Sequence, residues 1–88
     1  MRYRKFTQVA YIPTHAKGDI NHKDVQFGFI TSEIDSEHCY FVRYWRSRTD
    51  PELRTKADGE RTPVYLLTRC VTRSRQKILD MAKELGLC

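Results

Sequence analysis

The chain has 88 residues, which allows one small domain over residues 1–88 and excludes a multi-domain protein or an enzyme with a large cleft. Hydrophobic residues make up 40% and charged residues 31%, a balance that favours a folded chain over a disordered one. Sixteen Lys and Arg against eleven Asp and Glu give a net charge of +5, which favours an anionic partner such as nucleic acid or an acidic protein surface.

Cysteine usage and hydropathy predict the compartment. Cys39, Cys70 and Cys88 are odd in number and lack CxxC spacing, so neither a disulfide framework nor a zinc ribbon is indicated. The basic first residues lack the apolar run of a signal peptide, and no stretch reaches membrane-spanning length. We therefore expect a soluble, cytoplasmic protein that does not associate with membranes.

The first half of the chain predicts two strands joined by a polar loop. Residues 6–12 alternate apolar side chains up to Pro13, which cannot donate to a ladder. Residues 14–24, THAKGDINHKD, form the loop. Residues 25–32, VQFGFITS, place three large apolar side chains on one face, and Gly28 suits a bulge or a close backbone approach.

The most strand-like segment is 38–46, HCYFVRYWR, which follows a predicted tight turn at Asp35 and Ser36. Both of its faces carry aromatic rings, so one face is not ordinary solvent surface. The alternation places Tyr40, Val42 and Tyr44 on one face and Cys39, Phe41, Arg43 and Trp45 on the other.

The second half predicts a long charged loop over 47–63, a strand over 64–72 and a helix over about 73–86. The apolar stripe of the helix consists of Ile78, Met81, Ala82 and Leu85. Ser74 or Thr72 can cap its start and Gly86 its end.

One terminal helix leaves no β-α-β unit, so the sheet should be antiparallel and strongly curved. We predict a mainly β fold, a small SH3-like barrel of four to five strands with a C-terminal α-helix. A ferredoxin-like fold needs a second helix between strands, and residues 49–58 are too short and polar to provide one.

Residues 9–44 resemble small proteins of tailed bacteriophages and prophages. The shared pattern is a strand ending in P-x-HA-x-GD-x-x-H-x-D, then GF-[IV]-x-S, then an aromatic strand ending in FVRY. The resemblance implies a phage source and an SH3-like barrel, and no activity. Lys23 stands where proline is expected, and residues 47–88 have no counterpart in the pattern.

The loop 14–24 admits two interpretations. His15, Asp19, His22 and Asp24 offer the donor set of zinc or another divalent transition metal. However, His-x6-His is not a standard zinc spacing, and a lone polar loop gives ligands no rigid support. The favoured interpretation is a structural connection, in which Gly18 allows a left-handed turn and the aspartates accept backbone N–H bonds.

No residues have the arrangement of a catalytic site. Cys39 follows His38 directly, and neighbours on a strand point to opposite faces, so they cannot act as nucleophile and base. Asp19 and Asp24 could pair as carboxylates, but a small barrel offers no deep cleft to separate their pKa values. We expect a binding protein and not an enzyme, with no cofactor.

Nucleic acid is the favoured partner, because arginines and aromatic rings share the strand 38–46 and a second basic run leads into the helix. The alternative is that the rings belong to the core and the arginines reach outward. The predicted contact residues are Arg43, Trp45, Arg46, Arg48, Arg69, Arg73, Arg75 and Lys77.

A protein partner is the second candidate, either from the phage or from its host. Small barrels bind peptides through aromatic grooves, and such a module could inhibit or adapt a host complex. The predicted groove residues are Tyr11, Phe27, Phe41 and Tyr44. The sequence leaves the oligomeric state open.

Overall fold

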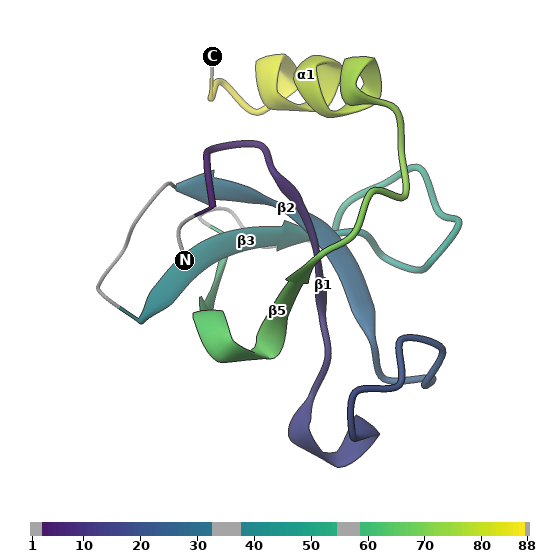
Figure 1. Ribbon diagram of the computed structural model, residues 1–88. Coiled ribbons are helices and arrows are strands. Elements are labelled where there is room, and N and C mark those ends of the chain that lie inside the picture. Colours follow the sequence, from purple (N-terminus) through teal and green to yellow (C-terminus); the bar gives the residue numbers. More distant parts are fainter. Residues whose placement is uncertain (1–2, 33–37, 55–58, 88) are drawn as a thin grey trace.

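The computed structural model describes residues 3–32, 38–54 and 59–87, in which five antiparallel strands curl into a half-barrel beside one helix (Figure 1). The elements are β1 (Gln8–Tyr11), β2 (Gln26–Ser32), β3 (Cys39–Tyr44), β4 (Glu60–Pro63), β5 (Leu67–Arg69) and α1 (Arg75–Glu84). The strand order is β4-β3-β2-β1-β5. The predicted mainly β, SH3-like barrel with a C-terminal helix is confirmed.

Two parts of the predicted second half are wrong. Strand β4 (Glu60–Pro63) lies inside the segment 47–63 that was predicted to be only a loop, because pairing with β3 and not its own polar sequence makes it a strand. The predicted strand 64–72 is shorter, since Val64–Leu66 forms a 3-10 turn after Pro63. The predicted turn at Asp35 and Ser36 lies outside the described residues, although β2 and β3 pair antiparallel as expected.

Both faces of the sheet are buried, which confirms the alternation predicted for β2 and β3. The inner cluster contains Tyr3, Val9, Ile30, Tyr40, Val42, Tyr44 and Leu67. The outer cluster contains Ala10, Ala16, Val25, Phe27, Phe29, Trp45 and Ile78. A sheet with two apolar faces needs a second layer, and this chain supplies it with α1 and with the loop between β1 and β2.

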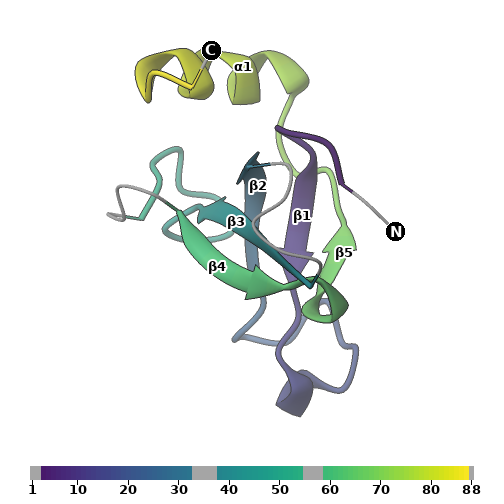
Figure 2. The same ribbon diagram turned by 90° about the vertical axis from the view of Figure 1, so that its left-hand side faces the viewer.

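Helix α1 covers one end of the outer face, opposite the end where residues 14–25 fold (Figure 2). Its start is capped by Ser74, whose Oγ accepts from the backbone N–H of Lys77 at 3.2 Å. Ile78 and Ala82 are buried against the sheet, as the apolar stripe predicted. Within the described residues no helix is long and apolar enough to span a membrane.

A buried glutamine links β1 to the start of α1. The side-chain oxygen of Gln8 accepts from the backbone N–H groups of Thr72 and Arg73, at 3.1 and 2.9 Å. Its Nε2 donates to the Arg73 carbonyl at 2.7 Å. This amide therefore holds the turn that leads the chain from β5 back over the sheet.

Changing Gln8 to Leu is expected to lower the free energy of unfolding by about 1–3 kcal/mol, because two backbone N–H groups and one carbonyl lose their partner. Gln76→Leu is the matched control, since Gln76 is exposed on α1, and it should change stability by less than about 0.5 kcal/mol. Urea unfolding measures both values, and equal losses would contradict the role of Gln8.

Candidate functional site

An open groove of about 780 Å³ runs between the β1–β2 loop (residues 12–25) and the segment 45–54 that follows β3. Both segments project on the same side of the molecule, at the right of Figure 1. The sheet forms the floor of the groove, where Tyr11, Gln26 and Phe27 line it.

The walls of the groove are strongly cationic. Among the described residues that line it, Lys23, Arg46, Arg48 and Arg54 carry permanent positive charge and Asp24 alone is an acid. Arg46 forms an ion pair with Glu52 at 2.5 Å, and Arg54 forms one with Glu60 at 3.1 Å. Exposed ion pairs are weak, so these guanidinium groups can exchange carboxylates for a stronger anionic ligand.

Backbone pairing fixes the arginines of the 45–54 segment. Trp45 and Leu53 form an isolated β-bridge, and the backbone N–H groups of Arg46 and Arg54 donate to the carbonyls of Glu52 and Tyr44. The segment therefore extends β3 as a narrow hairpin. Alternation along this hairpin carries Arg46 and Arg54 to the edge of the groove.

Arg48 is held from the opposite loop. Its Nη2 donates to the carbonyl of Ile20 at 3.0 Å, and its guanidinium lies 4.6 Å from the centre of the Phe27 ring. The cation is thereby stacked on the floor of the groove while the residue stays exposed. Arg48 thus connects the two walls.

Trp45 is a core residue, 2% exposed, which confirms the alternative interpretation of its ring. The indole packs on Phe29 at a centroid distance of 6.0 Å and on Ile78 of α1. Arg73 covers it at 4.1 Å. In this arrangement the ring offers no free face on which a base could stack, contrary to the predicted contact set.

Arg73 also has a structural role. Its guanidinium donates to the carbonyls of Asp50 at 2.6 Å and Ser47 at 3.4 Å, in addition to covering Trp45. Partial burial lowers the pKa of this side chain, although the nearby Asp50 opposes that shift. Arg73 therefore ties the 45–54 segment to the start of α1 and shapes the wall of the groove from behind.

The remaining predicted contact residues lie away from the groove. Arg69 and Arg75 are exposed and line a small separate hollow near α1. Lys77 lies over Trp45, with its ammonium 6.0 Å from the ring centre. Arg43 is half-buried on β3. The structure thus brings only Arg46 and Arg48 of the predicted basic set to one place.

The predicted aromatic groove forms only in part, since Tyr11 and Phe27 line the open groove and Phe41 and Tyr44 do not. Tyr11 and Tyr44 meet edge to face on the inner side of the sheet, with ring centres 6.2 Å apart. Burial raises the pKa of the Tyr44 hydroxyl, which is bonded to Thr62 Oγ1 at 2.8 Å. Phe27 lies on the opposite side of the sheet, and Phe41 is half-buried elsewhere on β3.

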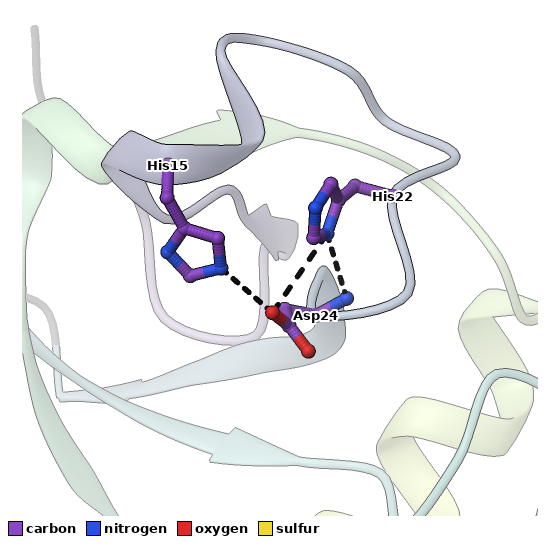
Figure 3. A group of neighbouring side chains, drawn as sticks. All are labelled: His15, His22 and Asp24. Atoms are coloured by element: carbon purple, nitrogen blue, oxygen red, sulfur yellow. Dashed lines mark hydrogen bonds and ion pairs between the residues drawn. The ribbon is translucent and has the colours of Figure 1, made fainter.

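Three of the four candidate metal ligands converge beside the groove (Figure 3). Asp24 Oδ2 lies 2.7 Å from His15 Nε2 and 3.9 Å from His22 Nδ1. The hydrogen bond from His15 lowers the pKa of the Asp24 carboxyl below its usual value. Asp19 is not part of this group, because its carboxylate accepts from the backbone N–H of Asn21 at 2.9 Å as a turn residue.

The chain matches no protein-family model, no curated protein and no solved structure. Its site is therefore argued from its own residues. Sequence reasoning missed Lys23 and Arg54, which lie in segments that read as connections and meet across the groove only because the sheet curls. No local sequence pattern indicates that two such segments lie on opposite sides of one groove.

Proposed function

We propose that the protein binds nucleic acid in the cationic groove and does so without turnover. The observation that carries this proposal is the set of four permanent cations and one carboxylate that line a single open groove among the described residues. Phosphodiester groups recur along a nucleic-acid chain, and arginine forks suit their oxygens.

The present partners of the groove arginines support this proposal. Arg46 is paired with Asp50 and Glu52, and Arg54 with Glu60 and the side-chain oxygen of Gln26. These partners are exposed or half-buried, so phosphate can replace them at small cost. Arg48 has one guanidinium face on Phe27, which leaves the opposite face for a base or a phosphate. The groove is open along its length, which suits a chain-like ligand better than a small molecule.

The double variant Arg46→Glu/Arg48→Glu is expected to weaken binding of a labelled single-stranded oligonucleotide by at least about 30-fold in low salt, measured by fluorescence anisotropy. The reason is that two phosphate contacts become repulsions. Wild-type affinity should also fall steeply as salt rises, because phosphate neutralisation releases counterions.

The matched control is Arg69→Glu/Arg75→Glu, which changes the net charge equally but lies near α1 and outside the groove. It should weaken binding by less than about threefold. Equal losses in both variants would show that the groove is not the site, and absence of binding by the wild type at low salt would refute the proposal altogether.

A phage origin and a role as an inhibitor or adaptor of a host complex stay predictions. Two of the four aromatic residues predicted for a protein partner, Tyr11 and Phe27, line the groove, which gives this alternative less support than the four cations give nucleic acid. Co-purification with and without nuclease distinguishes the two: a partner lost on nuclease treatment favours nucleic acid, and a protein retained after it favours the alternative.

A further inference from the structure

We propose that His15, His22 and Asp24 bind a divalent transition-metal ion, of the class of Zn²⁺, at the edge of the groove. One ligand atom from each side chain lies within 4.8 Å of the other two. Figure 3 shows the two imidazole rings and the carboxylate turned toward one another from the β1–β2 loop. Metal binding here does not depend on the proposed nucleic-acid function.

The donor set selects the kind of metal. Two imidazole nitrogens and one carboxylate oxygen suit zinc, cobalt or nickel, whereas calcium and magnesium prefer oxygen ligands throughout. The carboxylate of Asp24 lies between the two imidazole rings, and its Oδ2 is hydrogen-bonded to His15 Nε2.

The distances fit with small adjustments. Zinc bonds of about 2.0–2.1 Å in a tetrahedron place ligand atoms about 3.4 Å from one another. The two measured separations, 2.7 Å for His15 to Asp24 and 3.9 Å for His22 to Asp24, lie on either side of this value. His15 and Asp24 have side chains 62% and 47% exposed, so rotation of these side chains brings the ligands into place.

Backbone hydrogen bonds and buried neighbours hold the β1–β2 loop in place, which the sequence alone did not indicate. His15 lies in the 3-10 turn Thr14–Ala16, which closes with Lys17 in the left-handed region at φ 52°. The carbonyl of His22 accepts from the backbone N–H of Val25 at 3.1 Å. Ala16 and Val25 are buried in the outer cluster beside these ligands. The backbone that carries the three ligands is thus fixed at both ends.

Binding a metal costs little in existing bonds. His22 Nδ1 accepts from the backbone N–H of Asp24 at 3.0 Å, and this N–H can turn to water because Asp24 is exposed. His15 donates to Asp24 through Nε2, and an exposed imidazole moves its proton to Nδ1 to free that nitrogen. Three bonds to the metal replace these two weak contacts.

The site would be an open one. Three protein ligands leave at least one coordination position to water or to an anion. His15 and Asp24 both line the groove, so this position faces the space beside Lys23. A metal ion would add positive charge to the β1–β2 wall, where Lys23 is the permanent cation among the described lining residues, opposite the three arginines of the 45–54 segment.

Zinc titration of the EDTA-treated full chain by calorimetry tests the proposal, and we expect one equivalent to bind with a micromolar Kd. Asp24→Asn and His22→Ala should each weaken binding by at least about 10-fold. Asp19→Asn is the matched control, since it makes the same change in the same loop outside the cluster and keeps the side-chain oxygen that accepts from the Asn21 N–H. Its affinity should stay within about twofold of wild type.

A variant with Cys39, Cys70 and Cys88 all changed to Ser should keep the equivalent, because it removes every thiol, a strong class of zinc ligand, and leaves the cluster intact. Loss of the equivalent in that variant, unchanged affinity in Asp24→Asn, or no saturable binding below about 1 mM zinc would each overturn the proposal. Bound zinc should also raise the melting temperature of the wild type and not that of His22→Ala.

Discussion

Replacing Trp45 by Ala is expected to lower the free energy of unfolding by about 3–5 kcal/mol, which is a large share of the stability of a small domain. The indole is buried between Phe29 of β2, Ile78 of α1 and the guanidinium of Arg73. Alanine would leave a cavity at the junction of sheet, helix and 45–54 segment. Thermal or urea unfolding, followed by circular dichroism, measures the loss.

Tyr65→Ala is the control for this prediction, because Tyr65 is an aromatic residue that is 78% exposed. Its removal should change stability by less than about 0.5 kcal/mol. The opposite result for Trp45, unchanged stability together with lost oligonucleotide binding, would show that the ring serves a ligand and not the core.

Gly28→Ala is expected to lower the free energy of unfolding by more than about 3 kcal/mol, and to leave little folded protein at 37 °C. A Cβ at this position would lie 2.1 Å from the carbonyl oxygen of Arg43 and 2.9 Å from the Cα of Tyr44. Gly28 pairs directly with Tyr44, and β2 is the central strand of the sheet. A methyl group would therefore force the β2 and β3 backbones apart.

Gly18→Ala separates crowding from backbone strain. Gly18 has a positive φ of 80°, but a Cβ there would meet nothing within 4 Å. Strain of the left-handed region alone should cost about 1 kcal/mol. If Gly28→Ala costs no more than Gly18→Ala in the same unfolding experiment, the close approach of β2 to β3 is not what requires glycine.

The parts of the fold that depend on periodicity could be predicted from the sequence. Alternation over β2 and β3 places side chains on two faces whatever their partners are, and the stripe from Ile78 to Leu85 predicts the buried side of α1. Gly28 was recognisable because a glycine within an apolar strand marks a close backbone approach. These signals depend on local sequence alone, so they can be recognised without knowledge of the tertiary structure.

The parts that depend on distant contacts could not be predicted. Strand β4 has the sequence ERTP and gains its conformation from the edge of β3. From the sequence alone, an aromatic ring between arginines could be a stacking surface or a core residue. The position of α1 on the sheet makes Trp45 a core residue. The groove likewise depends on the curl of the sheet, which brings Lys23 close to the arginines of the 45–54 segment.

The loop THAKGDINHKD, residues 14–24, shows both what could be predicted from the sequence and what could not. Spacing alone counted against a metal, because it does not show that a 3-10 turn and the turn around Asp19 fold His15 and His22 back onto Asp24. In the turn around Asp19, the Asp19 carboxylate accepts from the Asn21 N–H and is therefore not one of the converging ligands. The residue types named four possible ligands, and the fold brings three of them together.

Nucleic-acid contact in the groove is tested most directly by NMR of the ¹⁵N-labelled protein titrated with a short single-stranded oligonucleotide at low salt. The largest shifts are predicted at Lys23, at residues 45–48 and at the side-chain Nε–H of Arg54, which all line the groove. Shifts confined to the surface around Arg69, Arg75 and Lys77, or no shifts at all, would contradict the proposed site.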